Sequence, residues 1–95
     1  MLSFQDEEIS NGERRIREWQ SKFVGLQSRL DRTMGDISEQ FEDMLQRLDE
    51  MRIRVEELKV PDTDTDSFEK LRGDITEINN RIEQDYLEIE RKLYS

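Results

Sequence analysis

The sequence lacks cysteine and histidine altogether, and it contains a single proline among its 95 residues. Without cysteine there are no disulfides and no thiolate nucleophiles, and without histidine the usual imidazole base and a common zinc ligand are missing. Most catalytic and metal-binding repertoires are therefore excluded. We expect no enzyme activity, no metal or other cofactor, and no small-molecule substrate.

Long apolar runs and a net positive charge are also absent. No segment approaches the roughly 20 apolar residues that a membrane-spanning helix needs. The first residues, 1–7, carry neither the basic nor the apolar part of a signal peptide. A net charge of -9 opposes nonspecific binding to nucleic acid or to anionic lipid. We therefore expect an intracellular, cytoplasmic protein with neither nucleic acid nor membrane among its partners.

Apolar residues are few, but they are periodic. Only 33% of the residues are hydrophobic and 41% are charged, which is too little apolar surface for a compact globular core. Such a polar composition is also typical of disorder, but disordered tracts lack a periodic apolar pattern. Nine positions spaced seven residues apart are all apolar: Leu2, Ile9, Ile16, Phe23, Leu30, Ile37, Met44, Met51 and Leu58. This repeat predicts a long helix that keeps one seam against a partner helix in a left-handed supercoil.

The proline predicts the boundary between two helices. Pro61 restricts the residue before it to extended geometry, so a first helix should end just before a loop over residues 60–66. Asp66 and Glu69 have the spacing of a capping box, in which each side chain accepts a hydrogen bond from an amide of the first turn. A second helix is therefore predicted over residues 67–94.

The first helix is predicted over residues 12–59. Ser10 and Glu13 form a second capping pair around an Asn-Gly helix breaker. Residues 1–11 are therefore predicted to be an N-terminal segment, either a frayed end or a short helical turn, with continuity into the main helix left open. The whole chain is predicted to be one all-α domain. Its long helix and shorter helix form an antiparallel coiled-coil hairpin that oligomerisation completes into a helical bundle.

Each predicted helix carries one apolar stripe. The stripe of the first helix is the predicted oligomer interface, and it consists of Ile16, Trp19, Phe23, Leu26, Leu30, Ile37, Phe41, Met44, Leu48, Met51, Val55 and Leu58. The stripe of the second helix is predicted to pack the hairpin, and it consists of Phe68, Leu71, Ile75, Ile78, Ile82, Tyr86, Ile89 and Leu93. Because the two helices differ in length, the N-terminal half of the first stripe has no partner in its own hairpin. An exposed apolar stripe of this kind is typical of a surface that binds another chain.

Charge favours an antiparallel pairing of two such chains. Residues 13–33 carry six basic and three acidic side chains, whereas residues 34–66 carry four basic and eleven acidic ones. In a parallel dimer like charges would face each other, and in an antiparallel dimer the basic half of each helix lies along the acidic half of its mate. The charges predicted to set this orientation are Arg14, Arg15, Lys22 and Arg29.

Five residues depart from the simple pattern. Val24 and Ile53 are apolar residues off the stripe, on a face that is otherwise polar or charged, and they are candidates for contact with a further partner. Three further residues are polar where strict heptads place core residues: Thr33, Gln40 and Asp85. Such polar positions can fix the register of a coiled coil, unless the seam passes beside them.

These observations predict a non-enzymatic oligomerisation or scaffolding module. The expected form is an antiparallel homodimer in which two long helices cross and each second helix folds back over its own chain. Each end is then a three-helix bundle made by two chains. The alternative is a small helical adaptor, regulator or chaperone, which captures a helix of a different protein through the stripe of residues 9–30.

Overall fold

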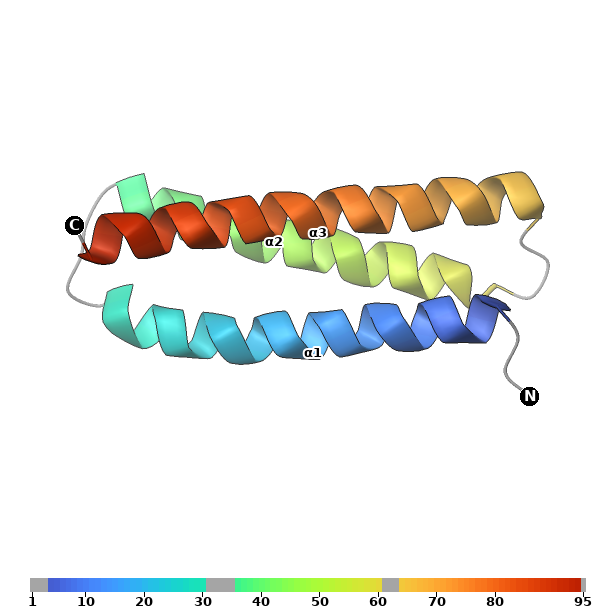
Figure 1. The fold of residues 1–95 in the computed structure, drawn as a ribbon, viewed down its shortest axis with the longest axis horizontal. Helices are drawn as coiled ribbons and strands as arrows, with labels where there is room; N and C mark the ends of the chain where they lie inside the picture. The colour runs from blue at the N-terminus through green and yellow to red at the C-terminus, as the bar shows by residue number, and fades with distance from the viewer. Residues whose placement is uncertain (1–3, 31–35, 61–63, 95) are drawn as a thin grey trace.

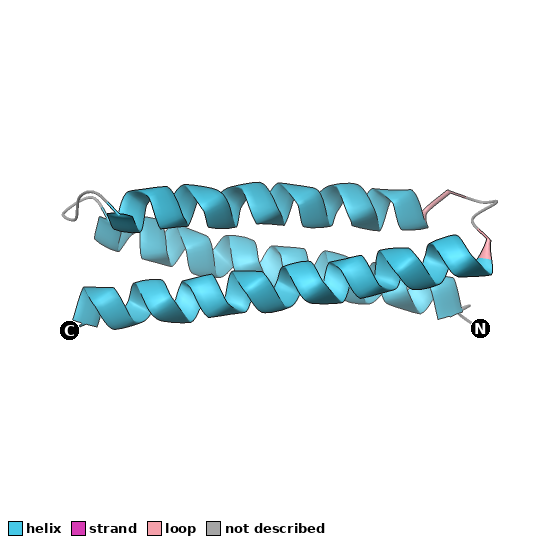
Figure 2. Cartoon of the chain, turned by 90° about the horizontal axis from the view of Figure 1, so that it is seen from above, coloured by secondary structure: helices cyan, strands magenta, loops and turns pink. Residues whose placement is uncertain are grey.

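The computed structural model describes residues 4–30, 36–60 and 64–94, which form three helices packed side by side (Figure 1). The helices are α1 (Phe4–Leu30), α2 (Asp36–Leu58) and α3 (Thr65–Tyr94). Successive helices run in opposite directions, so that α1 begins and α3 ends at opposite ends of the bundle (Figure 2). The principal extents are 47 × 22 × 17 Å. The prediction of an all-α fold that packs as a helical bundle is confirmed.

Within this single chain, the residues predicted to form one helix over 12–59 belong to two described helices. Helix α1 ends at Leu30, α2 begins at Asp36, and the two helices pack against each other rather than end to end. Helix α1 also continues through Gly12, so the described part of the N-terminal segment is continuous with the helix that follows it, the alternative that the sequence left open. Folding back brings the two halves of the stripe and α3 together within one chain. The three helices are closer in length than the two predicted ones, with 27, 23 and 30 residues.

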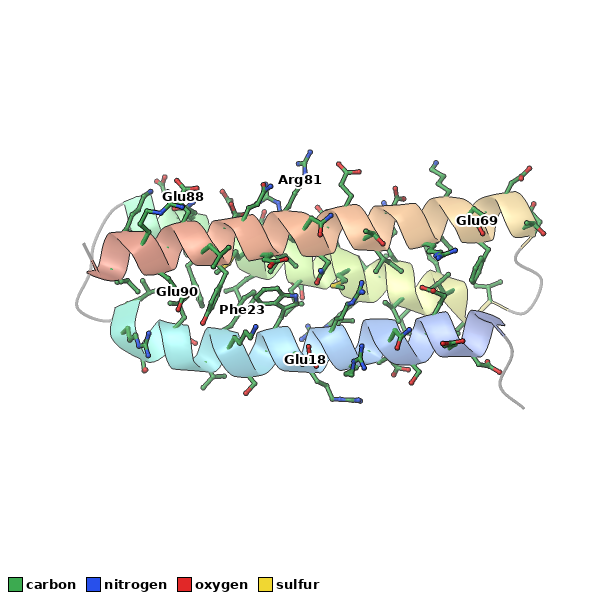
Figure 3. The ribbon with its side chains drawn as sticks, viewed as in Figure 1. Glu18, Phe23, Glu69, Arg81, Glu88 and Glu90 are labelled. Carbon is green, nitrogen blue, oxygen red and sulfur yellow. The ribbon has the colours of Figure 1, made fainter. Side chains whose placement is uncertain are left out.

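The predicted stripes form one hydrophobic core. All twelve members of the first stripe are buried, with at most 9% of each residue exposed. From α3, Leu71, Ile75, Ile82 and Ile89 are buried, while Phe68, Ile78, Tyr86 and Leu93 are partly buried against the same core. Figure 3 shows Phe23 projecting from α1 into the space between the helices, whereas Arg81 of α3 points away from it. The seven-residue spacing therefore identified the core, although the residues that it brings together belong to one chain.

Helix α3 begins two residues before its predicted start. Asp64 is the N-cap: its Oδ1 accepts a hydrogen bond of 2.7 Å from the amide of Ser67, and its carbonyl accepts one of 2.9 Å from the amide of Phe68. The hydrogen bonds from Ser67 lower the pKa of the Asp64 carboxyl, because they stabilise its charged form. Asp66, the predicted cap, lies in the first turn instead, where a carboxylate interacts favourably with the helix dipole.

Helices α1 and α2 lie close together at Gly12. A Cβ atom on this residue would lie 2.7 Å from Cγ2 of Val55, closer than two carbon atoms can pack. Val55 is buried and β-branched, so its side chain has few other positions to adopt. By contrast, Gly25 of the same helix has open space around it. The two glycines therefore have different roles in α1.

We expect Gly12→Ala to destabilise the bundle and Gly25→Ala to stabilise it. Both substitutions gain up to about 1 kcal/mol from the higher helix propensity of alanine. At Gly12 this gain is outweighed by overpacking, which typically costs 1 to 3 kcal/mol, so the net loss is about 1 kcal/mol. Urea unfolding followed by circular dichroism measures both changes. Equal stabilisation by the two variants would contradict the close approach of α1 and α2.

Candidate partner-binding site

The contact between α1 and α3 is centred on Trp19. Its Nε1 donates a hydrogen bond of 2.8 Å to Oδ1 of Asn79, and its ring packs against Tyr86 at a centroid distance of 5.6 Å. The ammonium group of Lys22 lies 4.8 Å from the indole centroid and 5.8 Å from the Tyr86 ring. A cation over aromatic faces is attracted by their negative electrostatic potential. The sequence placed Trp19 on the apolar stripe, but it did not indicate a hydrogen-bonding partner 60 residues away.

The charges predicted to orient a dimer have neighbours within the chain. Arg14 lies 3.8 Å from Glu18, one turn along α1, and both side chains are exposed. Arg15 lines a hollow between α1 and α3 that Glu18, Glu83 and Glu90 also line, and Lys22 occupies the aromatic site described above. Arg29 is exposed near the end of α1. Of these four charges, Lys22 is the one whose contact with an α3 side chain is described, through the ring of Tyr86.

Polar side chains also join α2 to α3. Arg47 donates a hydrogen bond to Asp85, and the two side chains are 31% and 19% exposed. Gln40 accepts a hydrogen bond of 3.1 Å from Nζ of Lys92. Gln40 and Asp85 thus lie at the edge of the core with partners, which agrees with a seam that passes beside them. Thr33, the third polar position named from the heptads, lies outside the described residues. Sequence reasoning did not identify Arg47 or Lys92 as those partners.

One lysine holds α1 against the C-terminal end of α2. Nζ of Lys59 lies 3.0 Å from Glu56 and 3.8 Å from Glu13 of α1. The hydrogen bond to Glu56, together with the charge of Glu13, raises the pKa of Lys59. At the same end of the bundle, Arg72 of α3 lies 3.5 Å from Glu8 of α1. These pairs are largely exposed, so they contribute more to the alignment of the helices than to stability.

The surface between α1 and α2 is apolar. Val24 is 70% exposed and Leu45 is 40% exposed, and both line one groove whose floor includes Phe23 and Phe41. Ile53 is 55% exposed but does not line this groove. The sequence singled out Val24 and Ile53 for a possible further partner, and the structure places them at separate positions. It brings Val24 together with Leu45 instead, so this groove is the candidate partner-binding site.

Neither metal binding nor membrane insertion is indicated within the described ranges 4–30, 36–60 and 64–94. No group of three or more acidic residues there is arranged to hold a metal ion. No helix in these ranges is long and apolar enough to cross a bilayer.

Comparisons with known proteins give no family for the chain. No family model matches the sequence, no curated protein matches it, and no solved structure matches the fold. The functional argument therefore depends on the residues and their geometry.

Proposed function

We propose that the chain is a non-enzymatic helical module for assembly, and that it forms an antiparallel homodimer by exchanging α1. In this dimer α1 of each chain packs on the α2–α3 hairpin of its partner. Helices α1 and α2 of one chain then run on as a single long helix. The dimer consists of two bundles, each with the same core as the monomeric bundle.

The observation that carries this proposal is the phase of the core across the turn between α1 and α2. Leu30 and Ile37 are both buried, and they lie seven residues apart. A continuous helix therefore keeps the α1 and α2 stripes on one face. Residues 31–35 contain no proline, whereas the connection between α2 and α3 contains Pro61. Only the first of the two turns has a sequence compatible with an uninterrupted helix.

The contacts of α1 support the same mode of association. The ring of Phe23 in α1 packs edge-on against that of Phe41 in α2, with the ring centroids 5.9 Å apart, and Nε1 of Trp19 donates a hydrogen bond to Asn79 of α3. Neither contact depends on which chain supplies α1. Exchange therefore keeps the interactions of the bundle and changes only the connection between α1 and α2. Mass action then determines the balance, so that a higher protein concentration favours the dimer.

The first test measures mass by light scattering as a function of concentration. We expect wild-type chains to change from 11.5 kDa towards twice that mass as the concentration rises. Deletion of residues 32–34 leaves too short a connection for α1 to fold back, yet it places Leu30 four residues before Ile37, a spacing that retains the heptad phase. This variant should be dimeric at every concentration. Insertion of a flexible Gly-Ser segment at the same place should give a monomer.

The second test shows whether a dimer arises by exchange. Glu13 and Glu56 both lie next to Lys59, so cysteines at these two positions can be joined by a short bismaleimide. The crosslink lies within one chain in the monomer and joins two chains in the exchanged dimer. Denaturing gel electrophoresis separates the two products, and the Glu13→Cys variant alone is the control. A monomeric deletion variant, or a dimer with crosslinks only within chains, would contradict the proposal.

A further inference from the structure

The groove between α1 and α2 continues along the bundle. One section, of about 470 Å³, contains Val24 and Leu45, and a neighbouring section of about 290 Å³ contains Ile16 and Val55 at its floor. Arg52 borders both sections. The α1 residues that line the groove run from 13 to 27, which corresponds to about 21 Å of helix. This length matches about four turns of a further helix.

The shape of the surface favours one helix as its occupant. Two neighbouring helices form a concave groove, and a third convex helix fits into it, as in helix-in-groove recognition. A second copy of this surface is equally concave, so two grooves would face each other across a gap. The exposed side chains of Val24 and Leu45 flank the groove and can cover the apolar side of a bound helix.

The charges beside the groove determine the preferred chemistry of that helix. Each acidic residue that lines it has a basic partner in the chain: Asp49 pairs with Arg52 at 3.0 Å, and Glu13 and Glu56 pair with Lys59. Arg17 also lines the groove, and it has no ion pair among the described residues. A carboxylate on the bound helix could therefore pair with Arg17 without competing against an ion pair among the described residues.

We propose that this groove binds an amphipathic helix from another protein, with a narrow apolar stripe that packs between Val24 and Leu45 and a flanking acidic residue that pairs with Arg17. The bound helix becomes the fourth helix of the bundle. The site is independent of dimer formation, because α1 and α2 form the same groove whichever chain supplies α1.

The test uses two synthetic peptides of 18 residues, each labelled with fluorescein. Both have leucine at the a and d positions of the heptad, and they differ only in glutamate or lysine at the flanking positions. Fluorescence anisotropy with the full chain should show that the glutamate peptide binds more tightly, by about fivefold. Arg17→Glu should reverse this order. Arg91→Glu, an exposed charge on α3, is the matched control and should leave the order unchanged.

Two further variants test the apolar part of the site. Val24→Asp and Leu45→Asp should each weaken binding of the glutamate peptide by about tenfold or more, because each places a charge against the apolar stripe. Circular dichroism confirms that the variants remain folded. The proposal is overturned if neither peptide binds at millimolar concentration, or if binding does not respond to Val24→Asp. It is also overturned if Val24→Cys chains crosslink to each other efficiently, because the groove is then covered by a second copy.

Discussion

Leu26→Asp is expected to leave the chain largely unfolded at 25 °C, whereas Val24→Asp, two residues earlier in α1, should leave the fold intact. Leu26 is 2% exposed and Val24 is 70% exposed. Loss of a buried leucine side chain costs about 2 to 5 kcal/mol, and an unpaired carboxylate in the core adds the cost of its desolvation. A domain of this size has a total stability of about 5 to 14 kcal/mol, so this single substitution removes a large part of it.

Far-UV circular dichroism and urea unfolding measure both variants. Because one continuous core joins all three helices, we expect the loss of helicity to be cooperative. If the two aspartate variants were equally stable, Leu26 could not lie in the core of the bundle.

Removal of Arg47 is expected to cost about 2 to 3 kcal/mol. The Arg47→Ala variant leaves the carboxylate of Asp85 without its partner at a position that is only 19% exposed. An ionised group that loses its hydrogen bond in a partly buried position costs more than the pair itself contributes. Asp85→Asn in the same variant should recover part of the loss, since it removes the unpaired charge.

A double-mutant cycle separates this pair from an ordinary surface pair. Arg14 and Glu18 are the matched control, because their side chains are 59% and 62% exposed. We expect a coupling energy of about 1 kcal/mol or more for Arg47 with Asp85, and below about 0.5 kcal/mol for the control pair. Equal coupling energies would show that the contact between α2 and α3 is as solvated as the surface of α1.

The sequence predicts which residues are buried better than it predicts the path of the chain. A heptad position faces another helix whether that helix belongs to the same chain or to a second one, so all twelve residues of the first stripe were identified. The turn between α1 and α2 was missed for the same reason. Leu30 and Ile37 keep the heptad phase in either arrangement, and no proline or Asn-Gly pair lies between them. Periodicity alone does not distinguish a long helix from a helix that folds back in register.

Local contacts that depend on the positions of individual atoms could not be predicted from the sequence either. Asp64 and Asp66 are both acceptable N-caps, and only the hydrogen bond to Ser67 identifies the first of them. Gly12 reads as a helix breaker, but it lies within α1, at a place where a larger residue would meet Val55. The groove itself was not predicted: Val24 was recognised as an apolar residue off the stripe, but the sequence did not indicate that it would line a groove together with Leu45.

The position of Trp19 gives the protein a natural optical probe. It is the only tryptophan in the chain, it is 7% exposed, and it contacts α3 through Asn79 and Tyr86. Separation of α1 from α3 would move the indole from this dry, hydrogen-bonded site into water, and its emission would shift to longer wavelength. Helicity measured by circular dichroism reports all three helices together, so a difference between the two signals reports the docking of α1 specifically.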